Sequence, residues 1–141
     1  AESACRRALE LRPQQANIHY RLCDLHLLQG RADDALLEAE READTLYRLL
    51  GIALAQLARR RSKESDAALQ ELVREHGDAA AYQIAEVHAK RGDADRAFEW
   101  LERAYRQRDA GLASMKVDHL LRGLHDDPRW RRLLGKMGFA E

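Results

Sequence analysis

Several features are scarce or absent in this sequence. Only two of its 141 residues are proline and two are cysteine. Few prolines leave helices uninterrupted, and two cysteines are too few for the disulfide framework of a small secreted domain. No apolar run approaches the roughly 18 residues that a membrane helix needs, and no secretory signal is visible. We therefore expect a cytoplasmic chain whose two cysteines are reduced.

The sequence also lacks a net charge. Lys plus Arg and Asp plus Glu each number 24. A balanced charge gives no general attraction to nucleic acid or to an anionic membrane, so we expect neither as a partner. The basic turn at 59–63 could touch phosphate or an acidic partner, and the basic face of the last helix could touch nucleic acid. Solvated surface is the simpler interpretation of both.

What the chain does contain is a helical composition. Its residues are 45% hydrophobic, and Ala, Leu, Glu and Arg dominate, which favours an all-α chain. Apolar residues recur at the spacing of one helix face. The predicted helices cover residues 1–11, 15–29, 33–43, 45–60, 62–76, 79–91, 94–107 and 128–137, and residues 109–125 are less regular.

Capping residues mark several of the predicted helix starts. We expect Asp44, Asp78 and Asp127 to cap helices, together with either Ser62 or Ser65. Pro128 supports the start at Asp127, because proline is favoured in a first turn. No glycine or proline separates the helices that meet at 43–45, so one long, bent helix stays open as an alternative there.

A pattern of small residues recurs along the chain. Gly92 is followed at +5 by Ala97 and at +9 by Leu101, and partial copies of the same figure begin at Gly30 and at Ala1. A period of roughly 30 to 34 residues indicates a repeat array. Small residues at helix contacts let two backbones approach, and stacked helix pairs bury faces that one pair leaves open.

These residues resemble the tetratricopeptide repeat family, whose unit of about 34 residues is a pair of antiparallel helices. In the first helix of each pair the family has a large apolar residue, then a small one, then an aromatic one, then Gly. Two sets of residues match this order, with His in the aromatic place. The sets are Leu22-Cys23-His26-Gly30 and Ile84-Ala85-His88-Gly92. Leu50-Gly51-Leu54 fits the start of a middle copy, and Ala8–Pro13 resembles a repeat ending. Two departures are Glu42 in the place of an Ala and the missing Gly of the middle copy.

The resemblance implies a right-handed α-α superhelix of stacked antiparallel helix pairs. Residues 1–108 would form a partial first repeat and three helix pairs, and residues 109–141 a helical C-terminal cap of a bacterial type. In such proteins the repeats often follow a signalling or transcription-regulating domain. The implied function is protein–protein interaction.

The sequence does not show the residue spacings that are typical of catalytic or metal sites. None of the six histidines has the i, i+4 spacing with an acid that suggests a zinc helix. His26 and His88 hold the same place in their repeats, which predicts a packing role. Cys5 and Cys23 fall at small core positions of the repeat. A packing role for them is therefore favoured over a role as a thiol nucleophile. We expect no enzyme, no cofactor and no metal.

The resemblance also implies an inner groove lined by the first helix of each pair. Two tyrosines, aliphatic side chains and mixed charges suit a peptide or a helix as the partner, although plain solvated surface is the alternative. The expected groove residues are Asn17, Tyr20, Asp24, Leu27, Arg48, Ile52, Gln56, Tyr82, Glu86 and Lys90, with Thr45 and Ala89 beside them. The family's clamp for a chaperone's C-terminal carboxylate is not matched, which argues against that partner.

Two further functions stay open. The chain starts at Ala1 in the middle of a repeat, so we expect a piece of a larger bacterial protein. The repeats would then serve as the regulatory or sensing arm of a cyclase or a transcription regulator. Self-association as a homodimer is the other possibility, because the first helix would expose an apolar face to be covered. That face comprises Ala4, Cys5, Ala8 and Leu11.

Overall fold

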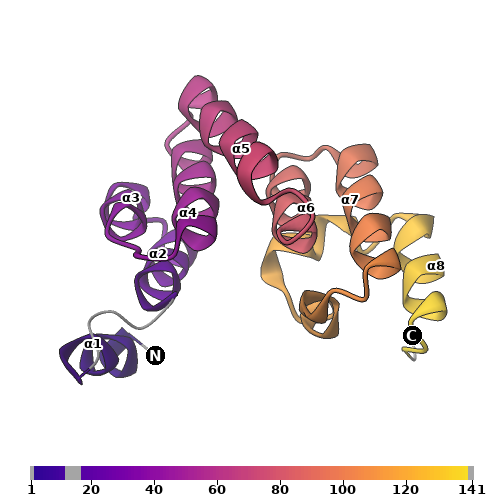
Figure 1. The fold of residues 1–141 in the computed structure, drawn as a ribbon, viewed down its shortest axis with the longest axis horizontal. Coiled ribbons are helices and arrows are strands. Elements are labelled where there is room, and N and C mark those ends of the chain that lie inside the picture. Colours follow the sequence, from indigo (N-terminus) through magenta and orange to yellow (C-terminus); the bar gives the residue numbers. More distant parts are fainter. Residues whose placement is uncertain (1, 12–16, 140–141) are drawn as a thin grey trace. The chain divides into compact units, whose positions relative to one another are not determined.

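The computed structural model describes residues 2–11 and 17–139, and over those residues the chain is helical with no strand (Figure 1). This confirms the all-α prediction. The chain divides into two compact units, Ala1–Glu75 and His76–Glu141. The stretch that includes Arg12 and Pro13 and the side chain of Leu9 lie outside the described residues.

Three helices form the body of the first unit: α2 (Ile18–Leu28), α3 (Ala32–Glu40) and α4 (Thr45–Ala58). Helix α3 lies against both α2 and α4, and α2 and α4 also contact each other (Figure 1). One cluster of the core between them is made of small, fully buried residues, namely Cys23, Ala35, Ala39 and Ala55. A Cβ atom on Gly51 would lie only 2.8 Å from the Cβ of Ala39. Small side chains therefore let these helices approach, as the repeat pattern predicts.

The junction at 43–45 separates two helices. Helix α3 ends at Glu40 and α4 begins at Thr45. The Asp44 carboxylate accepts a hydrogen bond from the backbone N–H of Tyr47 at 3.2 Å, so Asp44 caps α4 as predicted. The alternative of one bent helix is wrong.

Helix α1 (Glu2–Leu11) contacts α2 at one end of the first unit, and α5 (Ser62–His76) follows α4. The predicted inward face of α1 is wrong at Ala4 and at Leu11, which are both exposed, Leu11 to 72%. Ser65 is not a cap, because it lies inside α5. Its buried hydroxyl donates instead to the backbone carbonyl of Ala53 at 2.8 Å.

The same turn closes five helices. A residue with a left-handed backbone follows α2, α4, α6, α7 and α8, with φ between 56° and 81°. These residues are Gly30, Arg60, Gly92, Arg108 and Gly138. In each case the next N–H donates to a carbonyl five residues back, at 2.8 to 3.0 Å, which is the Schellman arrangement. The middle copy lacks the expected glycine but makes the turn with Arg60.

Replacing Arg60 with glycine is expected to stabilise the protein by about 1 kcal/mol, because glycine adopts a positive φ without the Cβ penalty of other residues. Arg60 has φ 63° and is exposed. Arg61→Gly is the matched control, since Arg61 is not among the residues with positive φ, and it should destabilise slightly. Thermal unfolding of both variants tests this. An Arg60→Gly melting temperature at or below the wild-type value contradicts it.

The second unit is built on the hairpin of α6 (Ala81–Lys90) and α7 (Ala94–Arg106). Ala97 and Ala104, which the repeat pattern places at helix contacts, are fully buried. Asp93 caps α7 by accepting the N–H of Arg96. Asp78 does not cap α6: its carboxylate pairs with the Arg103 guanidinium on α7.

The tail after α7 consists of three short helices, each preceded by an aspartate, and the three aspartates are nine residues apart. Asp109, Asp118 and Asp127 each accept the backbone N–H two residues further on, at 2.8 to 2.9 Å. They open the 3₁₀ helices η1 (Ala110–Ser114) and η2 (His119–Leu124) and helix α8 (Pro128–Lys136). Three and six residues after each aspartate stand buried side chains, namely Leu112, Met115, Leu121, Leu124, Trp130 and Leu133. Asp127 was predicted as a cap, but the nine-residue spacing was missed.

Candidate partner-binding surface

The predicted groove residues divide between the two units. The first unit holds Asn17, then Tyr20, Asp24 and Leu27 on α2, and Arg48, Ile52 and Gln56 on α4. The second unit holds Tyr82, Glu86 and Lys90 on α6. We refer to the residues of the first unit as the α2–α4 face.

Every residue of the α2–α4 face is half-buried. On α2 they are spaced i, i+4, i+7 and on α4 i, i+4, i+8, which places each set on one side of its helix. Leu27 and Ile52 pack against the core of small residues. The face is therefore continuous with the first unit's core, and its residues are partly open to solvent.

An aromatic pair lies at one end of this face. The rings of Tyr20 and Tyr47 have centroids 5.4 Å apart and are tilted by 43°. Tyr47 was missed in the sequence analysis. The signal that identifies it is its position four residues before Gly51, because both then face α2 from the same side of α4. A Cβ on Gly51 would lie 3.4 Å from the Tyr20 ring.

Polar side chains at the edges of the face are held by neighbouring groups. The Arg48 guanidinium donates to the backbone carbonyl of Glu42 at 3.0 Å. Arg59, from the basic turn, donates to Asp33 at 2.7 Å and to the side-chain oxygen of Gln56 at 2.8 Å. These contacts fix the directions of Arg48 and Gln56 before any partner arrives.

Tyr82 and Glu86 do not lie on an open surface, so their assignment to a groove is corrected. Their exposed fractions are 4% and 8%. The tail covers this side of α6: the Tyr82 hydroxyl donates to the Asp118 carboxylate at 2.6 Å, and a Cβ on Gly111 would lie 2.7 Å from the Tyr82 ring. Burial, and then the bond to Asp118, raises the pKa of Tyr82 far above its usual value. Lys90 is exposed.

His26 and His88 occupy equivalent places and are both buried, with exposed fractions of 3% and 5%. Neither Nδ1 atom has a hydrogen-bond partner in the structure. This burial confirms the predicted packing role. Burial also lowers the pKa of His88 below its ordinary value of 6.5.

The lowered pKa of His88 predicts a loss of stability in mild acid. Below about pH 6.5 the unfolded chain binds a proton at this histidine while the folded chain does not. Protonation therefore stabilises the unfolded state relative to the folded state. The loss continues down to the folded pKa and then levels off. Thermal unfolding of wild type and His88→Phe between pH 7.5 and 5 measures it, and the variant should lose less stability. Identical pH profiles would contradict the prediction.

The cysteines are free thiols among the described residues. Cys23 is fully buried, and burial raises its pKa to about 12, so the reactive thiolate does not form near neutral pH. Cys5 is only half-buried, so the core position predicted for it is wrong. Within residues 2–11 and 17–139, no group of three or more His, Cys, Asp or Glu side chains is placed to hold a metal. No helix in that part of the chain is both long and apolar enough to cross a bilayer.

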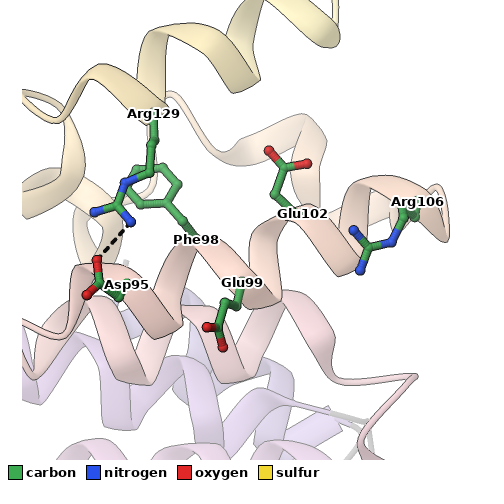
Figure 2. Close-up of a pocket in the computed structure, with 6 residues that line it drawn as sticks. All are labelled: Asp95, Phe98, Glu99, Glu102, Arg106 and Arg129. Atoms are coloured by element: carbon green, nitrogen blue, oxygen red, sulfur yellow. Dashed lines mark hydrogen bonds and ion pairs between the residues drawn. The ribbon is translucent and has the colours of Figure 1, made fainter.

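A shallow hollow of about 550 Å³ lies between α7 and α8 in the second unit, and Figure 2 shows its lining. Arg129, which reaches in from α8, donates to Asp95 at 2.9 Å and to Asp127 at 2.8 Å, and it lies over the Phe98 ring at 4.7 Å. Hydrogen bonds from Arg129 lower the pKa of Asp127 to about 2. These charges are already paired within the unit, so they fasten α8 to α7.

Comparisons with known proteins do not add a relative. No protein-family model, no curated protein and no solved structure matches the chain.

Proposed function

We propose that this chain is a protein-interaction module of the tetratricopeptide type, and that its α2–α4 face receives a peptide or a helix of another protein. The observation that carries the proposal is the packing of the first unit. Helices α2 and α4 contact each other while α3 lies against both. This order leaves one side of α2 and α4 as a half-buried stripe.

Internal repetition supports the repeat assignment. Tyr20 and Tyr82, His26 and His88, and Gly30 and Gly92 are each 62 residues apart. The two histidines share their burial, and the two glycines share their left-handed turn. Two copies of one helix with a buried histidine and a left-handed turn at the same places are expected of an array of similar units.

The chemistry of the α2–α4 face suits a segment that brings both apolar and polar groups. Tyr20 and Tyr47 offer rigid rings, which supply contact area at a small cost in conformational entropy. Ile52 and Leu27 offer aliphatic surface beside them. Arg48 and Gln56, held by their neighbours, can orient the backbone or side chains of the segment. Amphipathic helices and extended peptides both bind proteins in this way.

Selection from peptide libraries tests the proposal. One library encodes random 16-residue peptides and another amphipathic helices, and the enriched peptides are measured by fluorescence anisotropy. Tyr20→Ala and Ile52→Ala should each weaken binding about tenfold, the effect of losing a residue worth more than 1 kcal/mol. Leu37→Ala is the control, since Leu37 on α3 is an aliphatic residue with 55% exposure. Equal affinities in wild type and both face variants would refute the proposal.

Self-association remains a second candidate because of α1. Leu11 is 72% exposed on this helix. Sedimentation equilibrium at several concentrations decides it: a dimer that Leu11→Gln dissociates supports the idea, and a monomer at the highest concentration removes it. The role of regulatory or sensing arm in a larger bacterial protein rests on the family resemblance alone.

A further inference from the structure

The carboxylate of Glu42 lies between the first turns of two helices. One oxygen, Oε1, accepts the backbone N–H of Tyr20 at 3.0 Å. The other, Oε2, accepts the N–H of Asn17 at 3.2 Å and that of Asp44 at 2.9 Å. Glu42 itself belongs to the loop between α3 and α4 and is 2% exposed. Its side chain therefore joins the start of α2 to the start of α4.

This arrangement supplies hydrogen-bond partners both to the carboxylate and to the helix N-termini. A buried carboxylate requires compensating donors, and the N-terminal turn of a helix offers unpaired N–H groups and a positive dipole end. Helix α2 has no cap from its own N-cap residue, Asn17, whose side chain makes no capping bond. Glu42 supplies that cap from a distant place in the sequence. On the α4 side, Arg48 holds the backbone carbonyl of Glu42.

Both members of the aromatic pair are connected to this carboxylate. The Tyr20 N–H donates to it directly. Tyr47 donates its N–H to Asp44, whose own N–H donates to Glu42. Sequence analysis registers Glu42 only as a departure from the alanine of the repeat pattern. An alanine at this position cannot make any of the three bonds.

We infer that Glu42 is a positioning residue, which sets the spacing of α2 and α4 and thereby holds the Tyr20–Tyr47 pair of the α2–α4 face. Its consequence for partner binding rests on the proposed function. The spacing itself is a property of the free protein.

Glu42→Ala, Glu42→Gln and Glu38→Ala form the test set. Glu38 on α3 is the control. It is also a buried acid, 5% exposed, but its carboxylate accepts hydrogen bonds from other residues. It accepts from His19 at 2.8 Å and from Arg6 at 3.5 Å, on α2 and α1, and makes no bond to α4. The two alanine variants remove comparable buried carboxylates, but only one carboxylate spans α2 and α4.

Proton NMR of the free protein gives the first measurement. In Glu42→Ala the ring–ring cross-peak of Tyr20 and Tyr47 should weaken, and the amide protons of Asn17, Tyr20 and Asp44 should move upfield as their charged acceptor is lost. Glu38→Ala should retain the cross-peak and all three amide positions. If Glu42→Ala does not fold, Glu42→Gln replaces it, since the glutamine side chain keeps one acceptor oxygen. The backbone amide proton that moves furthest upfield from its wild-type position then identifies the lost bond. Unchanged spectra in the folded Glu42 variants overturn the inference.

The second measurement uses the peptides selected on the wild-type protein. Glu42→Ala or Glu42→Gln should weaken their binding by about tenfold, or about 1.4 kcal/mol, and Glu38→Ala should not. Equal losses in the Glu42 and Glu38 variants would make Glu42 a general stability residue and overturn the positioning role. Failure to select any peptide would count against the proposed function, whereas the cross-peak and amide shifts would still decide the inference.

Discussion

Gly51→Leu is expected to destabilise the first unit by about 3 kcal/mol, the upper end of the usual cost of overpacking a core. The reason is the lack of space where a side chain on Gly51 would begin. A Cβ there would lie 2.8 Å from the Ala39 Cβ and 3.4 Å from both the Cys23 sulfur and the Tyr20 ring. The Ala39 Cβ is fixed to the backbone of α3, so it cannot rotate away. Helices α3 and α4 would have to separate.

The smaller replacement Gly51→Ala separates packing from helix propensity. Alanine inside a helix is favoured over glycine by about 1 kcal/mol when nothing opposes it. Gly135 in α8 is the matched control, because a Cβ there meets no atom within 4 Å. Urea unfolding followed by circular dichroism should show a gain for Gly135→Ala and a loss for Gly51→Ala. A gain at both positions would mean that α4 does not approach α3 closely at Gly51.

Much of the helix packing could be predicted from the sequence because it follows short-range spacing. A small residue at a fixed distance from a turn marks a helix contact wherever the pattern recurs. Ala35 and Ala97 were identified in this way and Gly51 through the family resemblance, and all three are buried. The caps at Asp44 and Asp127 were predictable for the same reason, since each acts within three residues of itself.

What the sequence did not reveal depends on contacts between distant residues. Tyr82 and Asp118 are 36 residues apart, so no local period shows that the tail covers α6. Glu42 reaches Asn17 across 25 residues, and the repeat pattern makes it an exception without assigning it a task. Arg60 illustrates a different limit. Its left-handed turn is set by the helix ends around it, and glycine is a common but not a necessary residue there.

Tyr82→Ala is expected to cost about 3–5 kcal/mol of unfolding free energy, the usual range for removing a buried aromatic side chain. The ring fills the space between α6 and Gly111 of η1, and its hydroxyl binds Asp118 of η2. Removing it therefore leaves a cavity, and the Asp118 carboxylate loses its bond from the Tyr82 hydroxyl. Tyr82→Phe keeps the ring and removes the hydroxyl alone, so its cost should be about 1.5–3 kcal/mol, the value of a hydrogen bond to a charged group.

Tyr105→Ala provides the control in the same unit. Tyr105 is half-buried on α7, and its hydroxyl makes a longer bond, 3.3 Å, to the carbonyl of Lys136. Urea unfolding followed by tryptophan fluorescence reports on this unit, because Trp100 and Trp130 both lie in it. Amide exchange at Leu120 and Leu121 should accelerate in both Tyr82 variants and stay slow in Tyr105→Ala. If the Tyr82 variants leave exchange in η2 unchanged, the attachment of the tail to α6 does not depend on Tyr82, and the prediction is wrong.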